Sequence, residues 1–262
     1  EIGVRLVGSE MCIRDRTYRA VVKLGVMTNT EDMTGEILAK HPVSVTKEQI
    51  ERAVSKFVGE IEQVPPMYSA LKVNGKKLCD LARAGVTVER QARPVQLYSI
   101  EIIKMELPRV CMRVRCSKGT YIRTLCQDIG KKLSCGACME SLLRTKVSEF
   151  CVQDALRLSE IEERVQKAAG QTPSEQWNAE MFDFIYAVDS VFLQYKKAVI
   201  CKEWNKLLYN GNRMKKDMFV SYQKDLEQQK VRIYDEEGRF IGIYEYSEIH
   251  GDYKPVKLFM EA

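Results

Sequence analysis

The stretch from Val110 to Leu133 constrains the fold of this chain more than any other. Between Val110 and Cys116 large apolar residues alternate with smaller or charged ones, the period of a strand with one buried face. From Tyr121 to Leu133 apolar residues instead recur every three or four positions, which predicts an amphipathic helix. A short turn with Gly119 joins the two. A one-faced strand followed by a one-faced helix predicts a sheet flanked by helices.

Other segments repeat these two patterns. Thr46 and Gln49 form a capping box that predicts a helix over 47–58. Asn74-Gly75 is typical of a hairpin turn, and Gly85 closes a short helix over 77–84. We predict strands over 18–26, 68–73, 94–103 and 144–150, and a hairpin over 230–246. The fold class is therefore α+β, with a mixed, largely antiparallel sheet, helices beside it and a small β-rich C-terminal module.

Composition limits the class of protein. Hydrophobic residues make up 45% and charged residues 29%, which excludes disordered, collagen-like and coiled-coil chains. No apolar run approaches the roughly 18 residues of a membrane helix, so we expect no membrane partner. Residues 109–146 carry nine basic side chains against two acidic ones, 160–189 seven acids against two bases, and 196–216 seven bases against one acid. The basic blocks fit either a polyanion-binding surface or solvated helix faces.

The nine cysteines form no regular framework, so we expect free thiols in the reducing cytoplasm. Cys135 and Cys138 alone have the spacing of metal ligands or a redox pair. A zinc site needs about four ligands, and His41 and His250 lie far apart in the sequence. We therefore expect no metal and no cofactor, and a metal or redox protein stays an alternative that metal analysis would test.

The string Cys116-Ser-Lys-Gly-Thr-Tyr-Ile-Arg123 is the most informative one for function. A strand that ends at a glycine turn before a helix places Tyr121 and Arg123 at a helix N-terminus, beside the edge of a sheet. An aromatic ring next to a guanidinium suits stacking on a base and holding a phosphate or carboxylate. A packed tyrosine beside an exposed arginine is the simpler alternative.

This string resembles a motif of the TruB-type tRNA pseudouridine synthases, which modify uridine 55 in the T loop of tRNA. Several other segments resemble the same family in the same order, over about residues 17–158. They are Tyr18 to Gly25, Thr28-Asn-Thr-Glu-Asp32 with Gly35, Gln63 to Lys72 with Asn74-Gly75, Ala82 to Gly85, Arg93 to Val95, Leu133 to Ala137 and Leu142 to Thr145. Residues 205–246 are similar to the PUA-like module of bacterial members.

The resemblance implies a cofactor-free isomerisation, in which an aspartate attacks the nucleoside and the base rejoins the sugar through carbon. It also implies that the base leaves its stack to enter a pocket. Tyr18 would then stack on the base, Tyr121 would line the pocket and abstract a proton, and Leu142 would form an apolar wall. Arg123 would hold the nucleophilic carboxylate. Lys72 and Arg83 are candidates for phosphate contacts.

Two features depart from the family. Leu143 stands where the family usually has an arginine, which removes one cation beside Leu142. The family's nucleophilic aspartate lies in a Gly-Thr-Leu-Asp-Pro segment before the Tyr18 strand, and this chain has no such segment; Asp15 has unrelated neighbours. We therefore expect that the nucleophilic Asp is absent from this chain, and that the literal polypeptide is a fragment without isomerase activity.

Residues 1–16 resemble a translated sequencing adapter, and we expect them to be foreign to the protein. Arg5, Glu10 and Arg14 interrupt any apolar core, which excludes a secretory signal. The expected organisation is then 1–16 as an artefact, 17–158 as the catalytic domain, 159–189 as an acidic helical connector and 190–262 as a PUA-like RNA-binding module. The expected partner is the T-arm of tRNA, bound by a cytoplasmic monomer. The alternative function is a non-catalytic RNA-binding or tRNA-folding module.

Overall fold

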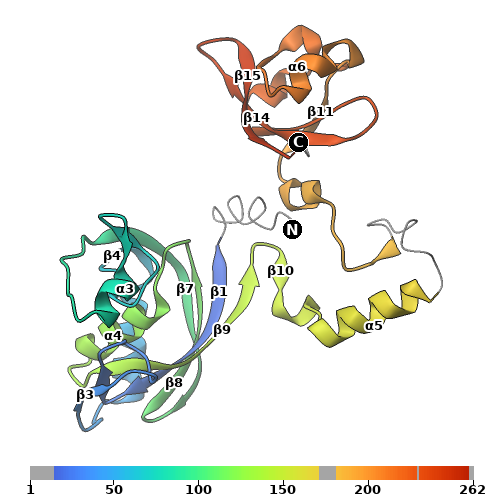
Figure 1. The fold of residues 1–262 in the computed structure, drawn as a ribbon. Helices are drawn as coiled ribbons and strands as arrows, with labels where there is room; N and C mark the ends of the chain where they lie inside the picture. The colour runs from blue at the N-terminus through green and yellow to red at the C-terminus, as the bar shows by residue number, and fades with distance from the viewer. Residues whose placement is uncertain (1–14, 171–180, 229, 260–262) are drawn as a thin grey trace. The chain divides into compact units, whose positions relative to one another are not determined.

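The computed structural model describes residues 15–170, 181–228 and 230–259 (Figure 1). The chain divides into two compact units, one of Gly8–Ala155 and one that includes Leu156–Ala262. Most of the segment expected to be foreign, residues 1–14, lies outside the described residues, as does 171–180 of the expected connector. None of the helices in the described ranges is both long and apolar enough to span a membrane.

A six-stranded sheet forms the centre of the first unit, in the order β10-β9-β1-β8-β7-β4. All neighbouring strands in it run antiparallel, and one isolated parallel bridge joins Asp32 to Met139 beside it. The largely antiparallel sheet expected from the sequence is thus confirmed. Its strands are β1 (Arg16–Leu24), β4 (Gly59–Gln63), β7 (Arg93–Glu106), β8 (Arg109–Cys116), β9 (Ala137–Val147) and β10 (Phe150–Cys151).

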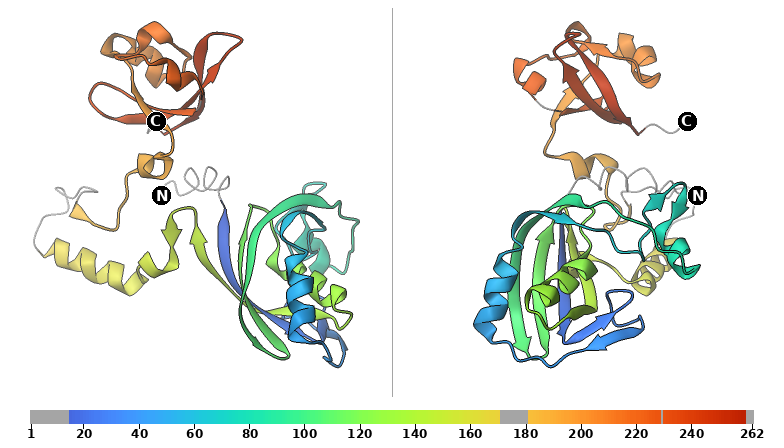
Figure 2. Two further views of the ribbon diagram at one scale, coloured as in Figure 1. Left: turned by 180° about the vertical axis from the view of Figure 1, so that it is seen from behind. Right: turned by 90° about the vertical axis from the view of Figure 1, so that its left-hand side faces the viewer.

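Two helices, α2 (Lys47–Ser55) and α4 (Ile122–Lys132), pack against one face of this sheet (Figure 2). In β8 the residues Val110, Met112, Val114 and Cys116 are buried, while the arginines between them are exposed. Burial of each large apolar side chain stabilises the fold by about 1.5–3 kcal/mol. Because a one-residue slip would turn these side chains to solvent, their burial also fixes the register of the strands. The helices and the buried alternate residues of β1, β7 and β8 form one hydrophobic core.

Local signals set the ends of both helices. The Thr46 hydroxyl accepts from the Gln49 backbone and the Gln49 side chain accepts from the Thr46 backbone, so the expected capping box is confirmed. The helix ends at Ser55, three residues earlier than expected, and Phe57 packs against the core from outside it. Tyr121 is the N-cap of α4, which begins at Ile122, one residue later than expected.

Two small hairpins extend from the sheet: β2 (Val26–Thr28) with β3 (Ile37–Lys40), and β5 (Lys72–Val73) with β6 (Lys76–Lys77), followed by α3 (Leu78–Arg83). The expected strand over 68–73 is wrong for residues 68–71 and forms only at Lys72–Val73. The Tyr68 carbonyl accepts from Arg123 and the Ser69 carbonyl from the backbone of Cys79, so neither is free for a strand ladder. The expected strand from 144 begins earlier, at Ala137, because β1 pairs with β9 along its whole length, from Val147 back to Ala137.

The second unit contains a five-stranded sheet in the order β11-β13-β14-β15-β12 around its own hydrophobic core. The expected hairpin is present as antiparallel β13 and β14, and β11 joins β13 in parallel. Its elements are α5 (Leu158–Ala169), β11 (Lys196–Val199), α6 (Asn205–Tyr209), β12 (Met214–Lys215), β13 (Lys230–Tyr234), β14 (Phe240–Ser247) and β15 (Asp252–Leu258). Short 3₁₀ turns over the two units are η2 (Val152–Asp154), η5 (Val188–Phe192), η6 (Lys202–Trp204), η7 (Lys216–Met218) and η8 (Lys224–Gln228).

Candidate functional site

Arg123 lies in the first turn of α4 and joins three segments of the first unit. Its Nη1 atom lies 3.2 Å from a carboxylate oxygen of Asp32 and 3.3 Å from the carbonyl oxygen of Thr30, and its Nη2 atom donates to the carbonyl oxygen of Tyr68 at 2.5 Å. The helix dipole disfavours a cation at a helix N-terminus. The three oxygen acceptors offset that repulsion and hold the guanidinium in one orientation, with 22% of the side chain exposed.

Hydrogen bonds within the turn from Thr28 to Gly35 orient the Asp32 carboxylate that pairs with Arg123. The Asp32 oxygen that does not face Arg123 accepts from the Thr30 hydroxyl at 2.9 Å, and from the Thr34 hydroxyl and backbone at 2.5 and 3.0 Å. Burial by itself would raise the pKa of Asp32, but these hydrogen bonds and the charge of Arg123 outweigh it and lower the pKa. Asp32 is therefore ionised at neutral pH.

Glu31 provides a second link between this turn and α4. Its backbone has a φ of 65°, a left-handed conformation that non-glycine residues rarely adopt. Its carboxylate accepts from the Thr124 hydroxyl at 2.7 Å, and burial raises its pKa. The two adjacent carboxyls of the turn therefore have opposite pKa shifts, and both contact the first turn of α4.

Tyr121 is held through its backbone by Gln63 at the end of β4. The Tyr121 N–H donates to Gln63 Oε1 at 2.8 Å, and Gln63 Nε2 donates to the Tyr121 carbonyl at 3.0 Å. The Gln63 side chain projects from the buried face of β4, and the residue is 2% exposed. Residues 63–68 thus contact α4 twice, at the peptide of Tyr121 and at the guanidinium of Arg123.

Tyr18 and Leu142 lie on the same face of the sheet, on the neighbouring strands β1 and β9. Tyr18 stands opposite Arg144 and Ala20 stands opposite Leu142, so Leu142 is a diagonal neighbour of Tyr18, a spacing that a large side chain can bridge. Tyr18 is half-buried, and burial raises the pKa of its hydroxyl. Leu142 is 42% exposed.

Strand β9 connects this pair with the Arg123 network. Asp32 bridges to Met139 of β9, three residues before Leu142, a separation of about 10 Å along a strand. The sheet therefore brings Tyr18, Leu142 and the Asp32–Arg123 pair into one region of the first unit. Their roles toward a base stay predictions.

Lys72 and Arg83 lie outside this region, in the segment formed by the β5–β6 hairpin and α3. Lys72 is exposed in the β5 hairpin, and the Arg83 side chain, 73% exposed at the end of α3, lies 3.6 Å from Asp80. Both can reach solvent and a polyanion, and their phosphate contacts stay predictions.

Two residues of the site, Asp32 and Gln63, were missed as functional candidates from the sequence. Asp32 stands in the Thr-x-Thr-x-Asp string, where closely spaced hydroxyls beside a carboxylate indicate a hydrogen-bonded turn. Gln63 is a lone amide in a strand, directly before a Val-Pro-Pro sequence. Nothing local in the sequence indicates that its partner lies 58 residues away.

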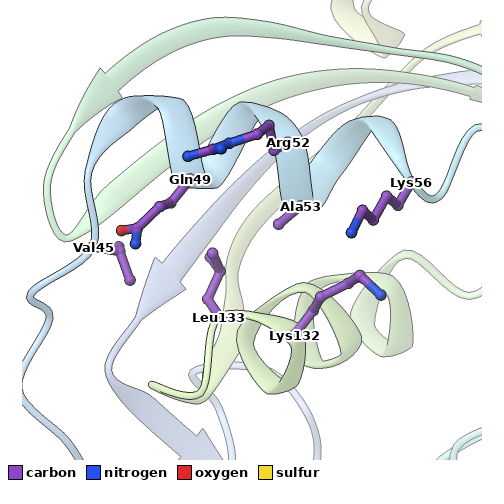
Figure 3. Close-up of a pocket in the computed structure, with 7 residues that line it drawn as sticks. All are labelled: Val45, Gln49, Arg52, Ala53, Lys56, Lys132 and Leu133. Atoms are coloured by element: carbon purple, nitrogen blue, oxygen red, sulfur yellow. The ribbon is translucent and has the colours of Figure 1, made fainter.

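A hollow of about 330 Å³ lies between α2 and α4, away from these residues (Figure 3). Among the described residues, its three cations have no carboxylate at ion-pair distance. They lie near the C-terminal ends of the two helices, where positive charge is favourable. The charge of this hollow therefore has a structural reason. Its lining residues are Val45, Gln49, Arg52, Ala53, Lys56, Lys132 and Leu133.

The cysteine pair and the basic block also have local explanations. Cys135 and Cys138 are buried, and burial is the main cause that raises the pKa of Cys138 to about 11, which keeps the thiol protonated at neutral pH. No group of three or more potential metal ligands occurs in the described parts of the chain. Within the basic block, Arg109, Arg113 and Arg115 each pair with a carboxylate, so much of its positive charge is balanced locally.

Solved structures with the same fold include two complexes. One is the crystal structure of a Cbf5–Nop10–Gar1 complex, with a TM-score of 0.66 and 19% identity over 98% of this chain and 68% of that one. Another is an H/ACA RNP bound to a substrate RNA containing 2′-deoxyuridine, with a TM-score of 0.64 and 18% identity over 97% and 69%. At these identities the likeness establishes the fold.

The fold and the motifs around Arg123 define a pseudouridylate synthase. The N-terminal domain model of TruB family pseudouridylate synthases matches residues 4–122, and the C-terminal domain model of tRNA pseudouridylate synthase B matches 123–193. Curated relatives named tRNA pseudouridine synthase B include one from Lachnoclostridium phytofermentans, 45% identical over 94% of this chain and 80% of the relative, and one from Clostridium novyi, 41% identical over 87% and 73%. The chain belongs to the TruB family.

Proposed function

We propose that the reaction of this protein is the conversion of uridine 55 in the T loop of tRNA to pseudouridine, and that this chain binds the target base for that isomerisation. The observation that carries the proposal is the Arg123–Asp32 pair at the N-terminus of α4, in the same region as Tyr18 and Leu142. Membership of the TruB family and relatives named tRNA pseudouridine synthase B support the substrate. A tRNA substrate also favours a cytoplasmic location.

The reaction rearranges bonds within one nucleotide. The bond from sugar C1′ to N1 of the base breaks, a bond from C1′ to C5 forms, the proton on C5 leaves, and N1 gains a proton. The base must therefore leave its stack and turn within a pocket. Tyr18 offers a half-buried aromatic face for that base, and Leu142 offers an exposed apolar side chain beside it.

Arg123 supplies a fixed positive charge for the reacting carboxylate. Among the described residues, the carboxylate at ion-pair distance from it belongs to Asp32, one of whose oxygens already has three donors. The resemblance assigns the attack to a different aspartate. We therefore assign Asp32 the role of orienting Arg123. We assign Tyr121 the role of abstracting the proton from C5 of the base.

Binding of a T-arm stem–loop RNA to the purified chain tests the proposal. We expect tighter binding to the RNA with uridine at the target position than to the same RNA with an abasic site there, because stacking of one base is worth about 1–3 kcal/mol. Arg123→Lys keeps the charge but cannot reproduce the fork of contacts, so it should remove the preference. The matched control, Arg113→Lys, changes an arginine paired with Glu101 at 2.6 Å and should leave the preference intact. Equal affinity of the unmodified chain for the two RNAs would overturn the proposal.

Conversion is a separate measurement. When the target uridine carries tritium at C5, isomerisation releases the label into water. The motifs of this chain include no match to the segment of the family's nucleophile, so we propose that the polypeptide binds the RNA without releasing tritium. Release by the purified chain would contradict that expectation, and would leave the assignment of the binding residues in place.

A further inference from the structure

Gln63 caps helix α4 from another part of the chain. A helix N-terminus leaves backbone N–H groups without partners, and they are usually satisfied by a side chain of the first, non-helical residue. That residue here is Tyr121, whose side chain makes no capping hydrogen bond. The amide of Gln63 satisfies one of these groups instead, because its Oε1 atom accepts from the N–H of Tyr121 itself at 2.8 Å.

The same amide also holds the carbonyl group of Tyr121. Gln63 Nε2 donates to the Tyr121 carbonyl at 3.0 Å, and that carbonyl also accepts the first helical bond, from Leu125. One buried amide thus sets the position of both backbone groups of Tyr121. The direction of its ring and of the helix turn that carries Arg123 depends on these two contacts.

Gln63 and the carbonyl that receives Arg123 belong to one rigid segment. Pro65 and Pro66 are buried, and the Pro65 carbonyl accepts from Arg90 at 3.1 Å. Two prolines allow little backbone freedom between Gln63 and the Tyr68 carbonyl. The spacing between the two contacts that this segment makes with α4 is therefore fixed.

We infer that Gln63 is a positioning residue for the reaction: it holds Tyr121 and, through the first turn of α4, Arg123 in the orientation that receives an extruded pyrimidine. The inference rests on the proposed function. Gln63 does not contact the base in this scheme, and it acts through Tyr121. A glutamine with only a structural role in the core would affect the folded population and leave base recognition by the folded protein unchanged.

The measured quantity is the ratio of the two affinities defined above, for the T-arm stem–loop with uridine and for its abasic counterpart. Both RNAs sample the same folded protein, so a change in folded population cancels in the ratio. Gln63→Glu keeps the size and the acceptor, but its ionised form cannot donate to the Tyr121 carbonyl. Gln63→Met keeps the approximate volume and removes both hydrogen bonds.

The pH dependence of Gln63→Glu distinguishes positioning from packing. Burial and the facing carbonyl raise the pKa of the introduced carboxyl, while Arg93, opposite it on β7, and Arg123 lower it. The protonated form restores the donor. At low pH we therefore expect the affinity ratio of Gln63→Glu to equal that of the unmodified chain. As the pH rises through that pKa, in a scan from about pH 5 to about pH 8, the ratio should fall about tenfold. In Gln63→Met the ratio of the two affinities should be lowered at every pH.

Gln49→Glu is the matched control, because glutamate serves as well as glutamine in the capping box of α2. It and the unmodified chain should show no such pH dependence. An unchanged ratio in both Gln63 variants would overturn the inference and leave the proposed function standing. Loss of the folded state in both would assign Gln63 to the core and overturn it too. A ratio of one in the unmodified chain would instead remove the proposed function, and this inference with it.

Discussion

The two units each contain a partly buried arginine that ties distant segments together, and the two arginines differ in one respect. Arg123 is 22% exposed and contacts Asp32 and two carbonyls. Arg232 of β13 is 13% exposed, donates to the Tyr195 carbonyl at 2.9 Å and lies 3.9 Å from Asp189. Burial, carbonyl acceptors and a carboxylate partner are thus common to both.

The difference is their place in the backbone. Arg232 stands within a strand, and its neighbour Tyr234 donates to Asp189 at 2.6 Å, so the network closes on itself and ties η5 to β13. Arg123 stands at a helix N-terminus, where its charge is intrinsically unfavourable and its partners come from the turn 28–35 and the segment 63–68. A partly buried ion pair therefore does not by itself indicate a site. An arginine kept where the helix dipole opposes it is the stronger indication.

The largest expected effect separates these two arginines. Arg123→Lys should lower the preference for uridine over an abasic site by about 2 kcal/mol, roughly 30-fold, because lysine cannot keep three acceptors in one plane. Arg232→Lys should lower the free energy of unfolding and leave that preference unchanged. Paired binding and urea-unfolding measurements on both variants check this. Equal loss of preference in the two would remove the distinction drawn between them.

Gly35 tests how far the site depends on its turn. A Cβ atom there would lie 2.2 Å from the Thr30 hydroxyl and 2.4 Å from the Asn29 side-chain oxygen. Gly35→Ala should therefore lower the free energy of unfolding by about 1–2 kcal/mol and displace Asp32, with a weaker uridine preference. Gly75→Ala is a useful control for strain alone, since a Cβ at that left-handed glycine meets no atom within 4 Å. It should cost stability without any change in preference.

In the second unit we expect one substitution to raise the free energy of unfolding, whereas those at Arg232, Gly35 and Gly75 lower it. The hydroxyl of Tyr244 is buried without a hydrogen-bond partner in the described structure, and burial raises its pKa to about 12. Tyr244→Phe removes that unpaired group and should raise the free energy of unfolding by up to about 1 kcal/mol. Denaturant unfolding measures the change, and a large decrease would show that the hydroxyl has a partner in solution.

The smallest effect concerns the two adjacent carboxyls of the turn. The pKa of Glu31 is raised by burial, so its contribution to stability is present below the ordinary carboxyl pKa and is lost as the pH rises through the raised value. Relative to Glu31→Gln, the wild-type free energy of unfolding should fall by less than about 1 kcal/mol between about pH 4 and about pH 7. Relative to Asp32→Asn, the wild-type free energy of unfolding should instead fall as the pH drops below the ordinary carboxyl pKa, because the lowered pKa of Asp32 stabilises the folded state above that value. Urea titrations at several pH values compare the two.

Much of this molecule follows from local patterns. Alternation in β8, the capping box of α2 and the periodicity of α4 depend on residues a few positions apart, and the structure confirms all three. The position of Tyr121 and Arg123 at the start of α4 follows from the same patterns. The strand expected over 68–73 forms only at Lys72–Val73, because the carbonyls of Tyr68 and Ser69 accept from Arg123 and Cys79 outside any strand.

What the sequence by itself determined is the set of elements, their buried faces and the family to which they belong, since side-chain periodicity and short motifs are properties of neighbouring residues. The tertiary structure decided which polar groups meet. Asp32 reaches Arg123 across 91 residues and Gln63 reaches Tyr121 across 58. Such contacts form only after the sheet and helices have packed, because hydrogen bonds act over about 3 Å and carry no trace in the local sequence.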